Sequence, residues 1–128
     1  MTRFLLVAAG GAIGSIARYG VGIAAQRLAP APAWPWGTLT VNVVGGLLMG
    51  LLAGWLAHRA AANTADLRAL IGVGLLGGFT TFSAFSLETA LMIERRQFAM
   101  AGGYVALSVV LSITALFAGL MVARKLVA

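Results

Sequence analysis

Four apolar runs, separated by short polar segments, make up most of this 128-residue chain. They cover residues from about 4 to 25, 37 to 57, 67 to 93 and 98 to 123. Roughly 20 apolar residues are enough for a helix to cross about 30 Å of hydrocarbon, and each run reaches that length. The pattern predicts an all-α membrane protein with four transmembrane helices in a single domain, 1–128.

The third run is interrupted by a glycine-rich and polar stretch, GVGLLGGFTTFSAFS, at residues 72–86. Its glycine pair, Gly77–Gly78, removes side chains and adds backbone freedom, which weakens a helix. Hydroxyl side chains then compete for the backbone hydrogen bonds, namely Thr80, Thr81 and Ser83. Free backbone groups at membrane depth are tolerated only inside protein or around a polar cavity, and half-helix ends there commonly hold ions. We therefore predict a broken third helix that forms an ion site.

Phenylalanines alternate with these hydroxyls. Phe82 and Phe85 stand three residues apart, so they share a face if the helix resumes after the break. One interpretation is that they face lipid or pack against a neighbouring helix, which is an ordinary role for an aromatic residue in a membrane. The other is that they line the ion site, and the hydroxyls between them favour it.

The composition excludes a soluble protein. The chain is 61% hydrophobic and 9% charged, with a mean hydropathy of +0.99, and no soluble domain of this size tolerates such a surface. The net charge of +6 does not indicate a nucleic-acid partner, because the nine Lys and Arg residues are spread over the ends of the apolar runs instead of forming a stripe. The absence of cysteine excludes a disulfide framework and a thiol metal site.

The polar segments predict three connections between the helices. Residues 26–35 contain all three prolines, and with Trp34 and Trp36 they predict a rigid loop anchored at the membrane interface. Residues 58–66 predict a second loop, whose one histidine is interfacial and not a ligand. Residues 94–97 predict a tight turn, so the third and fourth helices are expected to form an antiparallel hairpin.

The distribution of cations bears on orientation in the membrane. An even number of spans puts both termini and the second loop on one side. That side carries five cations, Arg3, Arg59, Arg68, Arg124 and Lys125, and the other side carries three, Arg27, Arg95 and Arg96. Orientation responds to such counts, and this weak bias lets the chain insert both ways. Four short helices also enclose little polar space, so the buried polar residues require a second copy, and an antiparallel homodimer satisfies both observations.

Two glycines and an arginine share one face of the first run. Gly10, Gly14 and Arg18 recur every four residues, and because glycine permits close backbone approach, this face is expected to meet protein. An arginine inside a span is costly unless it finds carbonyls, a carboxylate or water. Arg18 therefore has two interpretations: it bonds carbonyls of a loop or helix end, or it forms an electropositive vestibule that attracts anions.

A second glycine face in the second run consists of Gly46, Gly50 and Gly54, and it predicts another helix-packing surface. Asn42 lies four residues before Gly46, on or near that face. An amide in hydrocarbon needs partners. Asn42 either joins two helices by hydrogen bonds or presents its NH₂ donor to a permeating anion.

The last two runs hold further polar side chains. Glu88 is the only carboxylate inside a span, and it either titrates in a proton relay or serves as partner to a hydroxyl or to Arg18. In the fourth run, side chains with hydroxyl groups repeat every four residues, namely Tyr104, Ser108 and Ser112. They form a ladder about 12 Å long, which acts either as packing between helices or as a polar track.

Three blocks of the sequence resemble the Fluc family of fluoride channels, also called CrcB. They are GGAIG at 10–14 with Arg18-Tyr19, GTL at 37–39 with Val41-Asn42 and Gly45, and Gly74 with GGFTTFSAFS at 77–86. The spacing between the blocks agrees, and the resemblance extends from the first helix to the fourth. It implies a multi-pass channel in the bacterial inner membrane, not an enzyme. It also implies a dual-topology, antiparallel homodimer with two fluoride pores and a central sodium ion, which exports toxic fluoride passively.

The resemblance also assigns roles to individual residues. It makes Asn42, Phe82 and Phe85 pore-lining, with the ring edges presented to fluoride. Further pore groups are the hydroxyls of Thr81 and Ser83 and a polar track of Glu88, Tyr104, Ser108 and Ser112. Such donors replace the water around a small anion without trapping it at a full charge. The backbone carbonyls of Gly77 and Thr80 fall at the family's sodium positions, and two copies across a two-fold axis give four oxygens for a hard cation at the dimer axis.

Departures from the family pattern are few. Ser15, Leu47 and Ala84 replace frequent Ala, Phe and Thr, and Ser112 stands where many relatives have glycine. None of these changes removes a pore donor. A rival class, the small dual-topology proton-coupled multidrug exporters, also has four spans, but its chemistry requires an acid in the first span, whereas Glu88 lies in the third. A subunit without transport activity would need no broken helix.

Overall fold

The computed structural model describes residues 1–29, 34–59 and 64–127, and within them the secondary structure is entirely helical. The elements are α1 (Thr2–Leu28), α2 (Trp36–Ala57), α3 (Thr64–Leu67), the π-helical segment η1 (Arg68–Leu76), α4 (Gly77–Phe79), α5 (Phe82–Glu94) and α6 (Phe98–Val127). Elements α3 to α5 together form the third long helix. Four helices are long and apolar enough to cross a membrane, which confirms the predicted all-α architecture with a broken third helix.

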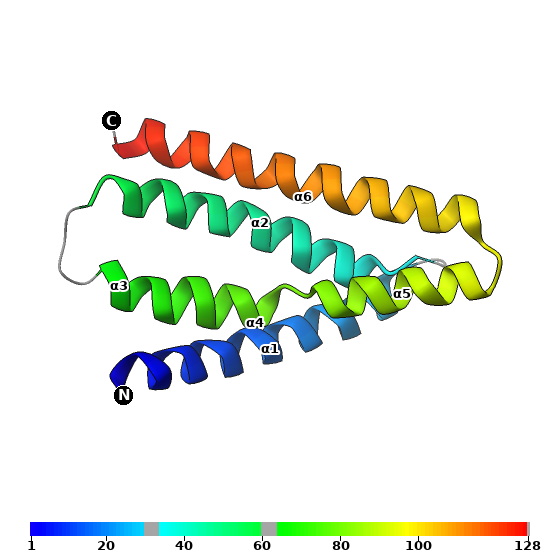
Figure 1. Cartoon of the computed structure of the whole chain (residues 1–128), viewed down its shortest axis with the longest axis horizontal. Helices are drawn as coiled ribbons and strands as arrows, with labels where there is room; N and C mark the ends of the chain where they lie inside the picture. Colours follow the sequence, from blue (N-terminus) through cyan, green and yellow to red (C-terminus); the bar gives the residue numbers. More distant parts are fainter. Residues whose placement is uncertain (30–33, 60–63, 128) are drawn as a thin grey trace.

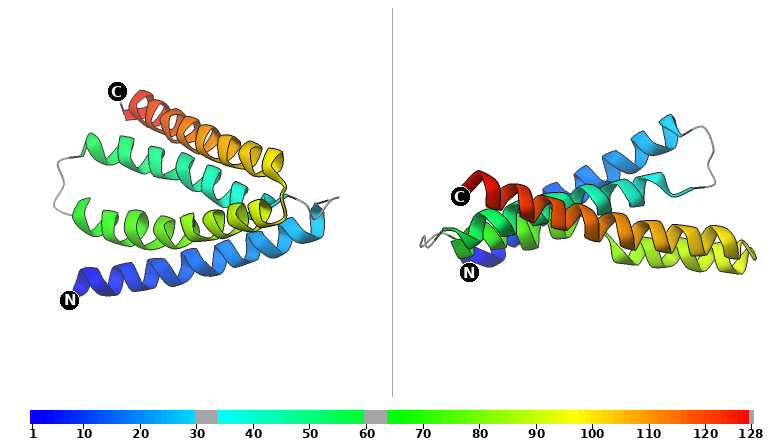
Figure 2. Two further views of the ribbon diagram at one scale, coloured as in Figure 1. Left: turned by 45° about the vertical axis from the view of Figure 1, so that its right-hand side comes forward. Right: turned by 90° about the horizontal axis from the view of Figure 1, so that it is seen from above.

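The helices alternate in direction, so both termini and the α2–α3 connection lie at one end of the molecule (Figure 1). This is the arrangement expected from an even number of spans. At that end, Arg3 Nε donates to Asp66 Oδ1 at 3.0 Å, and the pair joins the start of α1 to α3. Helices α2 and α6 run in the same direction and lie side by side, whereas α1 and α5 diverge beyond the break (Figure 2).

The helices extend beyond the predicted apolar runs. Helix α1 ends at Leu28, three residues past the expected boundary, and Thr64–Leu67 is already helical although it was expected to lie in the second loop up to residue 66. Helix formation at these ends does not depend on apolar side chains, so the helices are longer than the apolar runs. Of the predicted proline-rich loop, Pro30 and Pro32 lie outside the described residues. Trp34 and Trp36 flank the start of α2, with ring centroids 5.8 Å apart.

Glycine positions bring the helix backbones into close contact, as the two predicted glycine faces require. A Cβ atom added to Gly50 would lie 2.0 Å from the Leu116 carbonyl oxygen of α6. On the first face, a Cβ on Gly14 would lie 2.0 Å from the Leu75 carbonyl oxygen and 2.8 Å from the Phe79 nitrogen. Both packing faces are therefore confirmed: α2 packs on α6, and α1 packs on η1 and α4.

The third helix breaks at Thr80 and Thr81, which are the only extended residues between Thr64 and Glu94. Thr80 has φ −83° and ψ 160°, and Thr81 has φ −153° and ψ 117°. The predicted break thus lies within the stretch 72–86, but the glycine pair beside it stays helical, since Gly77 has φ −63° and ψ −38°. Gly78 lies against α1, where a Cβ would come within 2.6 Å of the Gly11 carbonyl oxygen. The glycines therefore serve close packing, and the break follows them.

The α5–α6 hairpin closes through the tight turn that the sequence predicts. Gln97 N–H donates to the Met92 carbonyl and Arg96 N–H to the Ile93 carbonyl, both at 2.9 Å. This is the hydrogen-bond pattern of a Schellman motif, which usually places glycine at the left-handed position. Here Arg96 occupies that position, with φ 58°.

The buried core lies near this hairpin, at the end of the molecule opposite the termini. Its members are Leu39, Met92, Ala101 and Tyr104, with Trp34, Val43, Phe85 and Met100 packed against them. Long stretches of α1 and α6 expose large apolar side chains, for example Ile16 at 72% and Val110 at 60%. Such surfaces fit a lipid environment or a second copy of the chain.

Candidate functional site

A groove of about 390 Å³ lies between α2, the break and α6. Seven of the predicted site residues line it, namely Asn42, Thr80, Thr81, Phe82, Phe85, Ser108 and Ser112. The groove is therefore where three separate elements bring the predicted polar and aromatic side chains together. Ser83, Glu88, Tyr104, Arg18 and Gly77 lie outside it.

Asn42 holds the break in place through both atoms of its amide. Its Nδ2 donates to the Thr81 carbonyl at 3.0 Å, and its Oδ1 accepts from Thr81 N–H at 2.8 Å. In an unbroken helix Thr81 N–H would donate to the Gly77 carbonyl, so the Asn42 side chain substitutes for a helical bond. Nδ2 has two N–H groups, one of which is committed to Thr81, and Asn42 is among the residues that line the groove.

The next residues start a new helix at the break. Thr81 Oγ1 accepts from Ala84 N–H at 3.1 Å and lies 3.3 Å from Ser83 Oγ, so Thr81 is the N-cap of α5. In an unbroken helix Ala84 N–H would serve the Thr80 carbonyl. The predicted Thr81 and Ser83 hydroxyls are thus hydrogen-bonded to each other at the N-terminus of α5, and Ser83 is exposed.

Phe82 and Phe85 are in contact, with ring centroids 5.5 Å apart. Their surroundings differ, because Phe82 is 79% exposed whereas Phe85 is half-buried against Tyr104, with centroids 5.2 Å apart. A phenylalanine with this exposure makes few packing contacts within the protomer. Phe82 therefore lines the groove with most of its surface uncovered in the protomer.

Two serine hydroxyls in the groove are buried without a hydrogen-bond partner among the described residues. They are Ser108 Oγ and Ser112 Oγ. A serine in a helix ordinarily bonds its own backbone, as Ser86 does with the Phe82 carbonyl at 2.9 Å. Unpaired hydroxyls at buried positions are costly, so both serines have donors available for a bound group.

Glu88 is held by two hydroxyl donors from different helices. Thr38 Oγ1 donates to Oε1 at 2.7 Å, and Tyr104 OH donates to Oε2 at 2.6 Å. Both carboxylate oxygens are therefore engaged by hydroxyls, and Arg18 bonds elsewhere. Tyr104 is fully buried and stands one helical turn from Ser108, so the predicted ladder of α6 passes through Tyr104 to Glu88.

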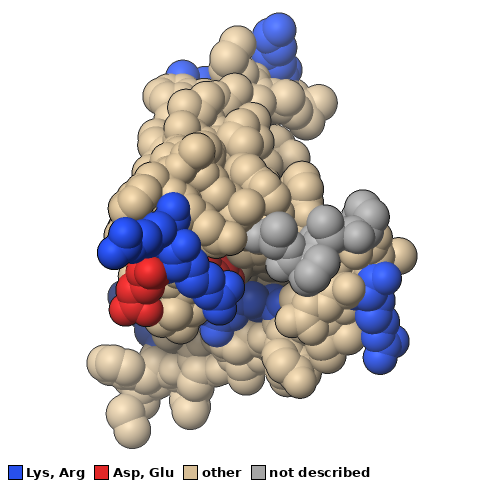
Figure 3. Space-filling view, turned by 90° about the vertical axis from the view of Figure 1, so that its right-hand side faces the viewer, with Lys and Arg blue, Asp and Glu red and all other residues tan. Residues whose placement is uncertain are grey.

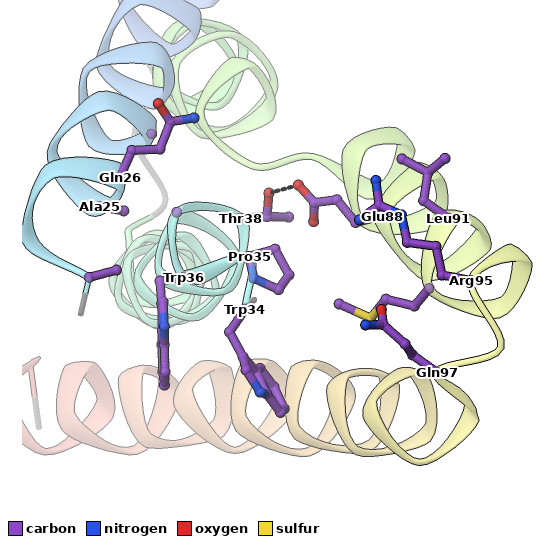
Figure 4. Close-up of a pocket in the computed structure, with 14 residues that line it drawn as sticks. Ala25, Gln26, Trp34, Pro35, Trp36, Thr38, Glu88, Leu91, Arg95 and Gln97 are labelled. Atoms are coloured by element: carbon purple, nitrogen blue, oxygen red, sulfur yellow. Dashed lines mark hydrogen bonds between the residues drawn. The ribbon is translucent and has the colours of Figure 1, made fainter. Parts of the chain in front are cut away.

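A second cavity, of about 450 Å³, opens at the hairpin end of the molecule, and Glu88 lies on its wall (Figure 4). Trp34, Pro35 and Trp36 form one side, and Arg95 and Gln97 line another. Seen from this end, cationic and acidic side chains sit together on one edge of the surface (Figure 3). Glu88 thus borders this cavity and accepts from Tyr104, which precedes Ser108 of the groove by one helical turn.

Arg18 lies beside the break in the third helix. Its Nη1 donates to the Thr80 carbonyl at 3.5 Å, and it lines a third cavity of about 430 Å³ with Ser15, Gln26 and Thr38. The sequence left two interpretations of Arg18, a bond to a helix-end carbonyl or an electropositive vestibule. In the structure the guanidinium bonds a helix-end carbonyl and also borders a cavity. The two interpretations are therefore compatible.

The break also frees backbone oxygens. Gly77 and Thr80 lose their helical donors, because Thr81 N–H goes to Asn42 and Ala84 N–H goes to Thr81 Oγ1. Neutral carbonyl oxygens are the ligands of a hard monovalent or divalent cation. Within the described parts of the chain, no three His, Cys, Asp or Glu side chains cluster to hold a metal.

Sequence reasoning did not identify Thr38 and Trp34 as parts of the site. Thr38 donates to Glu88, and Trp34 meets the Tyr104 ring edge-on, with centroids 6.1 Å apart. Thr38 precedes Asn42 by four residues, so their shared helical face was a signal for it. No comparable spacing pointed to Trp34, because it lies in a connection.

Comparison with known proteins agrees with this arrangement. The family model described as CrcB-like protein, Camphor Resistance (CrcB), matches residues 5–120. The chain is 62% identical to the Fluoride-specific ion channel FluC of Caulobacter vibrioides over 128 residues, which cover both chains completely. It is 57% and 53% identical to the proteins of the same name from Phenylobacterium zucineum and Hyphomonas neptunium, again over the full length of each chain. This protein is therefore a member of the CrcB family, with four helices that make it a multi-pass membrane protein.

Proposed function

We propose that this protein is a fluoride-selective channel that lets toxic fluoride leave the cell passively. The observation that carries the proposal is a pair of buried serine hydroxyls, Ser108 and Ser112, in a groove with the Asn42 amide; neither hydroxyl has a partner among the residues that the structure describes. Full-length relatives named fluoride-specific ion channels support it, at up to 62% identity. The role of the groove is passage of an ion, not chemical conversion.

The groove supplies the kind of donors that a hydrated anion requires. Fluoride binds its water strongly, so a pore must replace that water with hydrogen-bond donors while avoiding a fixed full charge that would trap the ion. Asn42 Nδ2, Ser108 and Ser112 are neutral donors, and the edges of Phe82 and Phe85 carry partial positive charge. The path continues from Ser112 and Ser108 to Tyr104 and Glu88 at the hairpin-end cavity.

We infer that two chains assemble as an antiparallel homodimer with two such pores in the lipid bilayer of the inner membrane. The groove of one protomer is open on one side, and Phe82 is 79% exposed beside it. A second copy would close the groove and bury the ring. Five cations on one side of the membrane against three on the other give little orientational bias, which supports insertion in both directions.

The freed carbonyls of Gly77 and Thr80 are the proposed ligands of a structural sodium ion at the dimer axis. They fit because they are neutral and have lost their helical donors. Two copies provide four oxygens across the two-fold axis. A bound sodium ion would supply positive charge that stabilises these oxygens; the chain's part is to hold the carbonyls in place through Asn42 and the N-cap Thr81.

Fluoride efflux from proteoliposomes tests the proposal. Purified protein is reconstituted into vesicles loaded with potassium fluoride, and external fluoride is followed with an electrode after valinomycin sets the potential. We expect rapid fluoride release without a proton gradient, and no release of chloride from matched vesicles. Proton movement that depends on an added cationic drug would instead identify the multidrug exporter, and silence in both assays would identify a subunit without transport activity.

A C-terminal reporter tests the assembly. A fluorescent or enzymatic tag that reports sidedness should be found on both faces of the membrane in comparable amounts. Adding two lysines after Lys125 is the matched control, because it raises the cation bias and should drive the tag to one face. Labelling from one face alone in the unaltered chain would rule out the antiparallel dimer.

A further inference from the structure

We propose that Arg18 and the bound monovalent cation compete for the Thr80 carbonyl, so that the guanidinium serves this oxygen whenever the cation is absent. Arg18 is then a positioning residue for the break, and it sets how tightly the cation binds. The inference rests on the proposed cation site, which belongs to the function proposed above. Its support comes from the contacts of the break itself.

At the break, only the Thr80 carbonyl accepts a hydrogen bond from a charged side chain of the described residues. Thr80 N–H and Thr80 Oγ1 both donate to the Leu76 carbonyl, at 3.0 and 2.9 Å. The N–H and carbonyl of Thr81 are both bonded to Asn42. The Thr80 carbonyl has lost Ala84 N–H to the Thr81 side chain, and Arg18 Nη1 approaches it at 3.5 Å.

The packing of α1 fixes where the guanidinium can reach. Gly14 lies directly against Leu75 and Phe79, where no Cβ atom would fit. Arg18 follows one turn later on the same face of α1, so its stem starts beside the end of α4. Because glycine packing holds the backbones together, α1 cannot withdraw from the break without losing that contact.

No carboxylate neutralises Arg18 in the described parts of the chain. The ion pair found there joins Arg3 and Asp66 at the other end of α1. The two oxygens of Glu88 are bonded to Thr38 and Tyr104. A cation at this depth needs an acceptor, and the Thr80 carbonyl provides it.

The geometry also lets Arg18 leave that oxygen. A distance of 3.5 Å is at the long end of a hydrogen bond, and the side chain lines an open cavity of about 430 Å³ with Ser15 and Gln26. Two cations at one carbonyl repel each other. The guanidinium is therefore expected to turn toward the cavity when a cation occupies the Thr80 carbonyl, and to return when the site empties.

The test measures thermal stability as a function of sodium. Wild-type protein, Arg18→Gln and Arg18→Lys are purified in detergent, and the unfolding midpoint is recorded while sodium replaces N-methylglucamine at constant ionic strength. Competition predicts that Arg18→Gln has a lower midpoint than wild type without sodium. It also predicts that this variant reaches half of its sodium-dependent gain at a concentration about threefold lower, which two unit charges a few ångströms apart give even in a water-like dielectric.

Two controls isolate the charge at this position. Arg18→Lys keeps the charge and should keep the half-saturating sodium concentration close to that of wild type. Arg27→Gln makes the same substitution in the exposed last turn of α1 and should change neither the midpoint nor the sodium response. If Arg18→Gln folds only in high sodium, that result also supports competition, because the cation then replaces the missing guanidinium.

Three results would overturn the inference: an Arg18→Gln midpoint lowered equally at all sodium concentrations, a higher half-saturating concentration in that variant, or failure to fold at every sodium concentration. A wild-type midpoint that ignores sodium would overturn it too. Fluoride efflux by the wild-type protein is measured separately. Efflux without any sodium response supports the channel and rejects the Arg18 inference. A sodium response without efflux rejects the channel and leaves the Arg18 inference standing.

Discussion

Asn42 and Thr81, 39 residues apart in the chain, exchange two hydrogen bonds. The amide of Asn42 thereby presents an acceptor to the Thr81 N–H and a donor to the Thr81 carbonyl, as a neighbouring strand would. A single side chain from α2 thus fixes the third helix in its broken form. Interhelical bonding and donation to an ion therefore involve the same amide and do not exclude each other.

This relationship makes a prediction for Asn42→Asp and Asn42→Leu. Both variants remove the donor to the Thr81 carbonyl, and Leu also leaves the Thr81 N–H unpaired, at about 1–3 kcal/mol for each orphaned group. Both should lose stability and fluoride flux, and Asp adds repulsion of the anion. Unfolding midpoints and proteoliposome efflux measure the two effects. Thr40→Val, on an exposed position of the same helix, should leave both unchanged, and wild-type flux in Asn42→Asp would remove this residue from the pore.

Substitution of either phenylalanine of the groove is predicted to lower fluoride flux far more than stability. Phe82→Ile keeps an apolar side chain but deletes the ring edge, and because Phe82 is 79% exposed in the protomer, the fold should tolerate it. Phe85→Ile loses the contact with Tyr104 and should cost about 1 kcal/mol. Both variants should form dimers with fluoride efflux reduced tenfold or more, as an order-of-magnitude expectation.

Packing alone would give a different result for these variants. If the rings only fill space, a folded dimer of Phe82→Ile or Phe85→Ile transports fluoride at the wild-type rate. Phe117→Ile, on the exposed surface of α6, is the matched control and should have no effect on either measurement.

The Tyr104–Glu88 bond is predicted to stabilise the fold, and a double-mutant cycle tests this prediction. Tyr104→Phe removes one donor from a carboxylate and should cost about 1–3 kcal/mol in the free energy of unfolding. In a Glu88→Gln background the same substitution should cost less, because the remaining acceptor is neutral. Denaturant unfolding in detergent measures all four proteins. An equal cost in both backgrounds would show that the charge of Glu88 adds nothing to the strength of this bond.

The left-handed residue of the α5–α6 turn predicts a stabilising substitution. A residue other than glycine in this conformation costs about 1–2 kcal/mol, whereas glycine adds about 0.5–1 kcal/mol of unfolded-state entropy. Arg96→Gly should therefore stabilise the protein by about 0.5–1 kcal/mol. Arg95→Gly removes the same charge at an ordinary φ of −78°, so it should destabilise by a similar amount. Unfolding measurements that rank the two variants in the opposite order would contradict the proposed strain at Arg96.

The sequence predicted the four helices and both glycine faces because these features depend on local periodicity. The length of an apolar run and a repeat of four residues are visible without knowing any partner. The sequence did not predict the polar ends of the helices, because Thr64 and Asp66 are helical but lie outside the apolar run. Hydropathy reports the depth of a residue in the membrane and not its backbone conformation.

The exact position of the break could not be read from local sequence for a related reason. Glycine propensity pointed to Gly77 and Gly78, but contact with Gly11 keeps that backbone helical. The Asn42 side chain then captures Thr81, and that contact joins residues far apart in the chain. A hydroxyl partner for Glu88 was one of the two expectations, but its donors, Thr38 and Tyr104, could not be identified from the sequence, because they depend on the relative rotation of three helices.

The ion pair between Arg3 and Asp66 has a consequence for biosynthesis. The two residues are separated by 63 positions, and at about 5–20 residues per second the ribosome needs roughly 3–13 s to make the segment between them. The first helix therefore enters the translocation machinery while Arg3 still lacks its partner. The ion pair can form only after Asp66 has been made, so it joins α1 to α3 at a late stage of biosynthesis.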